Sequence, residues 1–221
     1  MRERNAAARF GVVVYDDVEP IDIGGTIGVL SMARRVLPGL DAVTVAERCG
    51  PVRLSGGLTI LADVDFASLP PCDQLIVCGG PGWRRETTNA PMVDFLRRQP
   101  PTGLAAVCTG GLILAAAGVL DGRLATTRRH AVGSEAAAPL DLLTALAPTA
   151  RPRPAAVVDA GVVTGGGVSL AIDVTLYLIG RLYGDEACEE IARVIEYDRA
   201  FAVNKTALGH LRAADDAAVS N

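Results

Sequence analysis

Two patterns of hydrophobic and polar positions alternate along the chain. Short apolar runs predict strands, whereas apolar residues spaced three and four apart predict helices. Strands are expected at 9–15, 42–47, 74–78 and 104–107, with a further pair within 155–167. Helices are expected at 25–37, 91–99, 109–118, 134–147, 168–183 and 185–197, and a hairpin at 52–63. This alternation predicts an α/β fold, a mostly parallel sheet with helices on both faces.

The length of the chain favours a single domain. Its 221 residues, half of them hydrophobic, suffice for one sizeable core. No internal repeat divides the sequence, and the proline-rich stretch 148–155 is too short to separate two domains. Residues 201–221 are polar and are expected to form a C-terminal tail, either partly disordered or wrapped around a partner subunit.

Charge and cysteine content argue against several classes of protein. The net charge is −4 and the basic residues are scattered, so no nucleic-acid surface is expected. No apolar run approaches the roughly 18 residues of a membrane span, and the N-terminus lacks a signal peptide, so a cytoplasmic protein is expected. Five cysteines without a CxxC pair, and only two histidines, argue against a disulfide framework and a structural zinc site.

Cys108 differs from the other cysteines because it falls between two predicted elements. It follows the strand 104–107 and directly precedes a helix. Unpaired amides and the helix dipole favour an anion at such a position, so a thiol there ionises more easily and can act as a nucleophile. The small residues Ala106, Gly110 and Gly111 suit a sharp nucleophile elbow. A buried structural cysteine suits the same position, and spacing alone does not decide between the two interpretations.

Two further segments follow strands, at the edge where parallel sheets gather ligands. Gly79-Gly80-Pro81-Gly82 could present backbone amides to a developing negative charge, with the Thr109 amide as a second donor, or could be an ordinary turn. Asp22, in the segment PIDIGG, could face the thiol as a proton donor or acceptor, or could cap a helix. Trp83, beside the glycine loop, could line a pocket or cover the core.

Five separated segments occur in an order that resembles the ThiJ/PfpI superfamily. They are FGVVVYDDVEPIDIGG, LIVCGGPG, AAVCTGGLILAAAGVLDGRLATT, VVTGGGVSLAIDVTLYLI and IEYD. The resemblance covers residues 9–200 and implies a single domain with the flavodoxin-like, class I glutamine amidotransferase-like fold. Thr109 stands where protease-like members commonly carry a histidine, and the segments look most like those of isocyanide (isonitrile) hydratases.

The resemblance also implies roles for individual residues. Cys108 would be the nucleophile, and Asp22 the acid/base carboxylate hydrogen-bonded to it. Thr109 would support the site, with its amide and that of Gly80 as oxyanion-type donors to the substrate. No metal or organic cofactor is implied. The expected protein is a homodimer that acts on a small molecule.

One segment departs from the hydratase pattern. The residues ATT are usually followed by a histidine and an aromatic residue, but here by Arg128-Arg129-His130. The two arginines could favour an anionic or polar substrate, or could face solvent. His130 could assist a cysteine as a base, although a surface or packing role is the more common use of such a histidine.

The resulting hypothesis is a cysteine-dependent hydratase, a carbon–oxygen lyase. It would add water to an isocyanide through a Cys108 thioimidate and release an N-substituted formamide. One alternative is a glyoxalase-like or amidase-like enzyme that uses the same cysteine. The other is a non-catalytic redox-sensing or stress protein in which Cys108 is oxidised reversibly.

Overall fold

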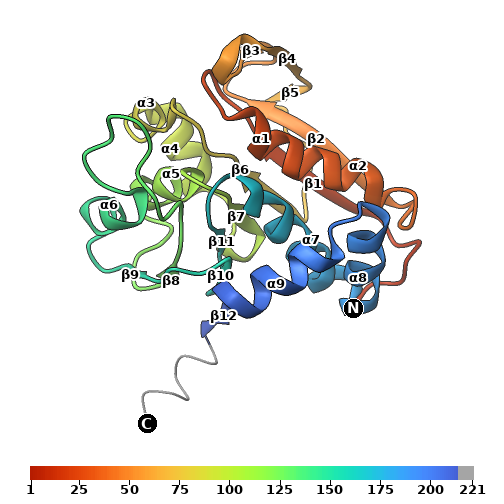
Figure 1. Cartoon of the computed structure of the whole chain (residues 1–221). Helices are drawn as coiled ribbons and strands as arrows, with labels where there is room; N and C mark the ends of the chain where they lie inside the picture. The colour runs from red at the N-terminus through yellow and green to blue at the C-terminus, as the bar shows by residue number, and fades with distance from the viewer. Residues whose placement is uncertain (214–221) are drawn as a thin grey trace.

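A computed structural model describes residues 1–213, and within them an eight-stranded sheet runs through the centre of the molecule (Figure 1). The strand order is β12-β10-β11-β7-β6-β1-β2-β5. Neighbouring strands pair in parallel, except β10 and β11, which are antiparallel. The strands of this sheet are β1 (Ala8–Val13), β2 (Leu40–Ala46), β5 (Val64–Asp65), β6 (Gln74–Val77), β7 (Leu104–Ala106), β10 (Val157–Asp159), β11 (Val163–Gly165) and β12 (His210–Arg212).

Helices cover both faces of the sheet (Figure 1). One layer is built around α5, which packs on β6 and β7, and the other around α7, which packs on β10 and β11. The first layer contains α3 (Trp83–Glu86), α4 (Ala90–Arg97), α5 (Gly110–Ala116) and α6 (Pro139–Leu146). The second contains α1 (Pro20–Ile23), α2 (Val29–Ala33), α7 (Ala171–Tyr183) and α8 (Asp185–Val194), and α9 (Asp198–Leu208) packs on α8.

The predicted α/β architecture is confirmed. The central strands are apolar on both faces because each face is covered by helices, and Val12, Ile76 and Ala105 are fully buried. The predicted hairpin is formed by β3 (Gly50–Arg53) and β4 (Thr59–Ala62), which project from the end of the sheet (Figure 1). A further short parallel pair joins β8 (Leu124–Ala125) to β9 (Arg151–Pro152).

Three predicted segments differ in their bounds. The helix expected at 25–37 begins at Pro20, which suits a first turn, passes through a π-helical turn at Gly24–Gly28, and ends at Ala33. The helix expected from 134 begins at Pro139, since a proline is well accommodated in the first turn of a helix. Residues 198–212 form α9 and β12, so the first part of the predicted tail folds onto the domain, and 214–221 lie outside the described residues.

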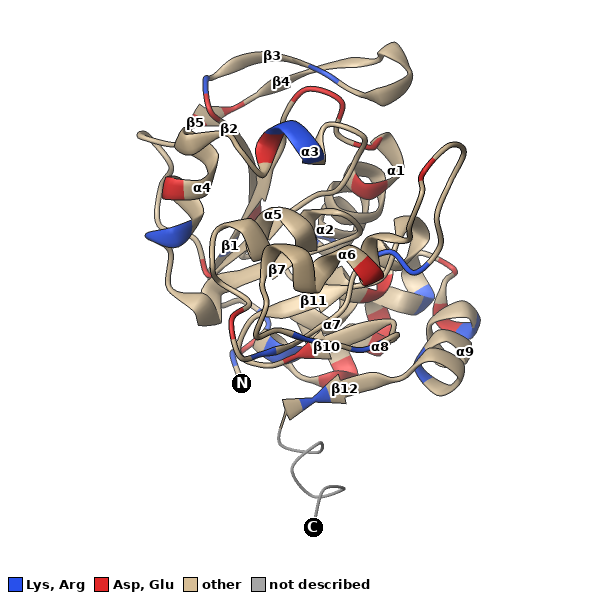
Figure 2. Cartoon of the chain, turned by 90° about the vertical axis from the view of Figure 1, so that its left-hand side faces the viewer, with Lys and Arg blue, Asp and Glu red and all other residues tan. Residues whose placement is uncertain are grey.

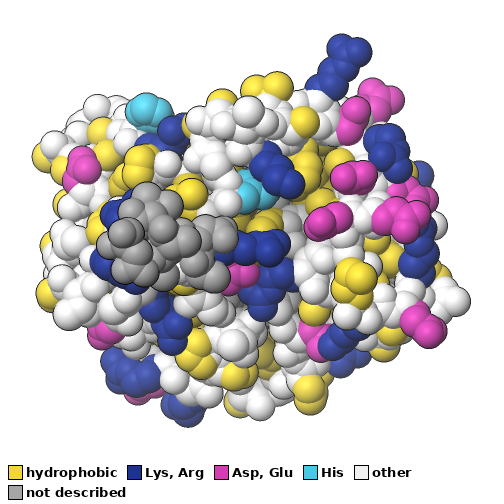
Figure 3. Space-filling view, turned by 90° about the horizontal axis from the view of Figure 1, so that it is seen from below, with side chains coloured by type: hydrophobic (Ala, Val, Ile, Leu, Met, Phe, Trp, Pro, Cys, Tyr) yellow, Lys and Arg dark blue, Asp and Glu magenta, His cyan; other side chains and the backbone are white. Residues whose placement is uncertain are grey.

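Acidic and basic residues occur in many of the elements in Figure 2, and side chains of both signs lie on the face that Figure 3 presents. Among the described residues, no helix has both the length and the apolar character needed to span a membrane.

Candidate active site

Cys108 occupies a tight corner between β7 and α5. Its φ is +51°, a left-handed conformation that non-glycine residues adopt only at a cost in free energy. The corner leaves no space behind it, because a Cβ at Gly110 would lie 2.1 Å from the carbonyl oxygen of Val77. The cysteine therefore stands at the strand-to-helix turn predicted from the sequence, where a nucleophile elbow would present its side chain.

Asp22 lies on α1 and is fully buried. Its Oδ2 accepts a hydrogen bond of 2.8 Å from the backbone N–H of Gly79. The thiol of Cys108 is close enough to this carboxyl group to lower its pKa. The second oxygen, Oδ1, has no hydrogen-bond partner among the described residues. The fold thus brings together a thiol and a carboxyl group from segments that are far apart in the sequence.

Burial sets the proton affinity of both groups. It raises the pKa of Asp22 to about 7, and the nearby charge of Glu19 adds to this effect, whereas the hydrogen bonds from Gly79 and Cys108 oppose it. Burial, together with the negative charge of Asp22, raises the pKa of Cys108 to about 12.

The raised pKa of Cys108 corrects the expectation that its position before a helix makes the thiol ionise easily. Amide groups do favour the thiolate, because the backbone N–H groups of Val168 and Thr109 hydrogen-bond to the sulfur. Desolvation nevertheless outweighs them. Between about pH 7 and about pH 12 the thiol and the carboxyl group of Asp22 together hold one proton, which either group can carry. Asp22 is thus placed to take the thiol proton when an electrophile arrives.

Thr109 joins the glycine loop to the cysteine corner. The N–H of Gly80 donates to Thr109 Oγ1 at 2.9 Å, and the same hydroxyl lies 3.3 Å from the carbonyl oxygen of Gly80. The glycine loop lies so close to the cysteine corner that a Cβ at Gly79 would be 2.5 Å from Thr109 N and 2.7 Å from the Cβ of Cys108. Both amides that were expected to donate to a substrate have partners within the protein. The amide of Gly80 donates to the Thr109 hydroxyl, and the amide of Thr109 points to the sulfur of Cys108.

A cavity of about 550 Å³ lies over Cys108. Trp83 and Arg128 line this cavity, whereas Arg129 and His130 do not. Of the unusual Arg128-Arg129-His130 stretch, only the first residue therefore faces it. The lining residues are Glu19, Gly80, Pro81, Trp83, Arg84, Cys108, Thr109, Arg128, Val132, Glu135 and Val168.

Sequence reasoning missed Val168 and Glu135. Val168 has a φ of +57°, which is unusual for a β-branched residue, and this turn directs its amide to the sulfur. The run of three glycines before it was the available signal for a tight turn. Glu135 accepts hydrogen bonds from Arg128 at 2.6 and 2.7 Å. The sequence predicts a helix from residue 134, but Glu135 lies before the start of α6 at Pro139, and nothing in the sequence paired it with Arg128.

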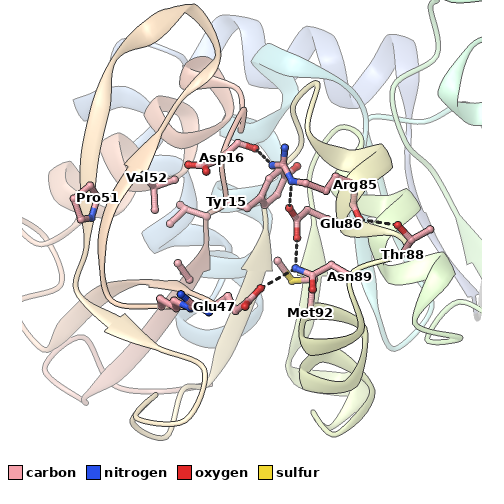
Figure 4. A pocket seen from close by; sticks show the side chains of 13 residues that line it. Tyr15, Asp16, Glu47, Pro51, Val52, Arg85, Glu86, Thr88, Asn89 and Met92 are labelled. Atoms are coloured by element: carbon pink, nitrogen blue, oxygen red, sulfur yellow. Dashed lines mark hydrogen bonds and ion pairs between the residues drawn. The ribbon is translucent and has the colours of Figure 1, made fainter.

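A second cavity, of about 580 Å³, is lined by residues from β3, from α3 and α4, and from the chain at the ends of β1 and β2 (Figure 4). Its charged side chains are largely engaged with one another. Arg85 pairs with the buried Glu86, which accepts a hydrogen bond from Asn89. Asn89 donates in turn to Glu47. Neither Cys108 nor Asp22 borders this cavity. Within the described part of the chain no group of three or more His, Cys, Asp or Glu side chains is arranged to hold a metal ion.

A cysteine at a strand-to-helix corner on the carboxyl edge of a parallel sheet is a common position for a nucleophile in α/β proteins. Residues 8–180 match the DJ-1/PfpI family, and the chain belongs to that family. The match agrees with the resemblance found in the sequence.

The similar proteins include an enzyme and transcriptional regulators. The chain is 32% identical over 194 residues to an isonitrile hydratase from Pseudomonas putida, covering 86% of this chain and 79% of the relative. It is also 32% identical to the HTH-type transcriptional regulator GbdR from Pseudomonas aeruginosa, covering 86% of this chain but only 50% of the regulator. Among solved structures, a ThiJ/PfpI family protein from Pseudomonas syringae matches with a TM-score of 0.74 and 27% identity, over 88% of this chain and 76% of that one.

Proposed function

We propose that this protein hydrates isocyanides to N-substituted formamides, with Cys108 as the nucleophile. The observation that carries the proposal is the pairing of the Cys108 thiol with the buried carboxyl group of Asp22, whose pKa of about 7 suits proton transfer near neutral pH. The similarity to an isonitrile hydratase supports the choice of substrate class.

The first step adds the thiol across the terminal carbon of the isocyanide. Cys108 Sγ forms a bond to this carbon while Asp22 takes the thiol proton and delivers it to the same carbon. The product is a thioimidate, in which the carbon is bound to sulfur and hydrogen and doubly bonded to nitrogen. No group leaves, so Asp22 ends the step in its starting protonation state.

The second step consumes water. Asp22 takes a proton from the attacking water, the carbon becomes tetrahedral, and the imine nitrogen gains a proton. The thiolate of Cys108 then leaves, the formamide is released, and the remaining proton returns to the cysteine–aspartate pair. The amides of Thr109 and Val168 stabilise the departing thiolate, since both hydrogen-bond to the sulfur. We assign the amide of Gly80 to the oxygen that develops from water, which requires this amide to exchange its hydrogen bond with Thr109 Oγ1 for one to the substrate.

Formamide release from an uncharged alkyl isocyanide tests this proposal. The wild-type protein should turn over repeatedly, and Cys108→Ala should lose at least about a thousandfold in kcat/KM, as expected when a covalent nucleophile is removed. Cys188→Ala is the matched control, because Cys188 is also buried but lies on α8 outside the cavity. Turnover by Cys108→Ala, or its loss in Cys188→Ala, would contradict the assignment.

The alternatives use the same cysteine and are separated by assay. A redox sensor would form a stable sulfinate at Cys108 after mild peroxide treatment and turn over none of the compounds. Glyoxalase-like and amidase-like chemistry could use the same cysteine. Assays of methylglyoxal and small amides beside the isocyanides would separate these reactions in one purified sample, and turnover of either compound in place of an isocyanide would replace the proposed substrate.

We also propose that the protein is a homodimer. The support is a groove beside α1 that is lined almost entirely by apolar and glycine residues, with Ile21 48% exposed. A Cβ at Gly24 or Gly28 would contact nothing, so this helix face is open to a partner. Sedimentation equilibrium should give twice the mass of the chain for the wild type and the mass of one chain for Met32→Arg, a groove variant. A monomeric wild type would refute the dimer.

A further inference from the structure

The cavity over Cys108 contains an ion pair that no other part of the reaction scheme uses. Arg128 Nη2 lies 2.6 Å from Oε1 and 2.7 Å from Oε2 of Glu135. The side chains are 11% and 22% exposed, so the pair is shielded from solvent more than a usual surface ion pair. Glu135 also accepts a hydrogen bond of 2.9 Å from the backbone N–H of Val132. The segment 128–135 is therefore tied back on itself at the wall of the cavity.

Arg128 is held from its other side by the turn next to the sulfur. A Cβ at Gly167 would lie 2.6 Å from Cγ of Arg128 and 2.9 Å from its Cβ, so the arginine stem lies directly on this glycine. Gly167 precedes Val168, whose amide hydrogen-bonds to Cys108 Sγ. The guanidinium group is thus fixed by the stem at one end and by Glu135 at the other, and it has little freedom to reach a ligand.

The charges around the cavity balance in pairs. Glu19 and Glu135 bring two negative charges, and Arg84 and Arg128 two positive ones. Arg84 lies 4.5 Å from the centre of the Trp83 ring, over its face. The remaining wall is apolar and is formed by Pro81, Trp83, Val132 and Val168. Asp22 beneath the cavity adds a negative charge when it is ionised.

We infer that the Arg128–Glu135 pair makes this cavity select uncharged, largely apolar electrophiles and reject anionic ones. With its guanidinium group already paired, Arg128 supplies no free charge for a carboxylate or phosphate. Arg84 offsets the charge of Glu19, so the charge that remains is that of ionised Asp22, which repels such a group. The substrate class is thus an isocyanide on an uncharged hydrocarbon body. The inference rests on Cys108 being the reacting group of the proposed function, and Arg128 and Glu135 act as specificity residues that form no bond to the reacting carbon.

Alkylation of Cys108 by two reagents of nearly equal size measures this selection without any turnover. Iodoacetamide is uncharged and iodoacetate is anionic, and peptide mass spectrometry gives the rate at Cys108 for each. The exposed Cys49 in the same molecule corrects for the intrinsic difference between the reagents. In the wild-type protein the corrected ratio of the iodoacetamide rate to the iodoacetate rate should be on the order of ten. This is the effect expected of one unit charge at short range in a protein.

Two single variants should move this ratio in opposite directions. Glu135→Gln frees the charge of Arg128, so the ratio should fall by on the order of tenfold. Arg128→Gln leaves Glu135 unpaired, so the ratio should rise. The double variant Arg128→Gln/Glu135→Gln restores neutrality, and its ratio should return to near the wild-type value. Asp94→Asn is the control, because it removes one carboxylate charge from the exposed Arg97–Asp94 pair on α4, away from the cavity.

The outcomes separate this inference from the proposed function. Ratios that do not change, or that move in the same direction in both single variants, would overturn charge selection, and either single variant decides the matter if the other fails to fold. A matched pair of substrates, an isocyanoacetate ester and free isocyanoacetate, extends the test to turnover. In the wild-type protein kcat/KM should be higher for the uncharged ester, and the ratio of the two values should shift in the variants as the alkylation ratio does. If neither compound is turned over while the alkylation ratios behave as expected, the isocyanide assignment fails and the selection for uncharged electrophiles stands.

Discussion

Replacing Asp22 with asparagine should stabilise the protein, and by an amount that depends on pH. The pKa of Asp22 rises from 3.8 to about 7 on folding, chiefly because the carboxyl group is buried. A difference of about three in pKa corresponds to about 4 kcal/mol. Asp22→Asn keeps the shape of the side chain and an oxygen that can accept the N–H of Gly79, but it removes the ionisation.

The direction of the pH dependence is set by whether Asp22 holds its proton in the folded and in the unfolded chain. Below pH 4 the carboxyl group of Asp22 is protonated in both the folded and the unfolded chain, and its burial carries no ionisation cost. Between pH 4 and 7 the unfolded chain loses this proton and the folded chain keeps it, so the free energy of unfolding of the wild-type protein falls. Above about pH 7 the full cost of about 4 kcal/mol is present. The buried Asp173, with a pKa of about 6, is common to both proteins and cancels in the comparison.

Urea denaturation of both proteins at several pH values tests this expectation. The free energy of unfolding of Asp22→Asn minus that of the wild type should grow by about 4 kcal/mol from pH 4 to pH 8. The same variant should lose its activity, since asparagine cannot accept the thiol proton. A difference that stays constant with pH, or that decreases toward pH 8, would show that Asp22 does not carry a raised pKa in the folded protein.

Three other expectations concern the same site. The rate of alkylation of Cys108 by iodoacetamide should rise as the pH passes about 7, where the cysteine–aspartate pair loses its first proton, and this step should disappear in Asp22→Asn; a step that persists would assign it to another group. Gly79→Ala should lower kcat/KM for formamide formation by at least about tenfold, because its Cβ would lie 2.5 Å from Thr109 N, whereas Gly103→Ala, whose Cβ meets only ordinary contacts at 3.6 Å, should match the wild type. Thr109→Val should lower the free energy of unfolding by about 1–2 kcal/mol in urea, because the buried amide of Gly80 loses its partner; an unchanged midpoint would mean that this bond contributes nothing.

The fold and the position of the cysteine could be read from the sequence because local signals carry them. Apolar runs of β-branched residues mark the central strands, and Gly110 and Gly111 leave space for the corner after β7. The start of the first helix was placed too late, because its initial turn contains the polar Asp22 and no periodic pattern. That turn is stabilised by the packing of α1 against α7, which a single segment does not reveal.

The protonation state of Cys108 could not be predicted from the sequence. Position before a helix predicts an acidic thiol, and the amides of Thr109 and Val168 do hydrogen-bond to the sulfur. Desolvation is the larger effect, and it depends on how completely several distant segments close around Cys108. The partner of Arg128 could not be predicted either, because Glu135 lies in an irregular segment before α6, and the ion pair depends on how this segment folds back.

The most direct test of the account is to locate the bond formed during turnover. Acid quenching of the reaction with an uncharged alkyl isocyanide, followed by peptide mass spectrometry, should show the peptide containing Cys108 heavier by the mass of the whole isocyanide. No such gain should appear at Cys49, Cys72 or Cys188, and none in Cys108→Ala. Formamide production by Cys108→Ala, or an adduct at a different cysteine during turnover, would contradict covalent catalysis by Cys108.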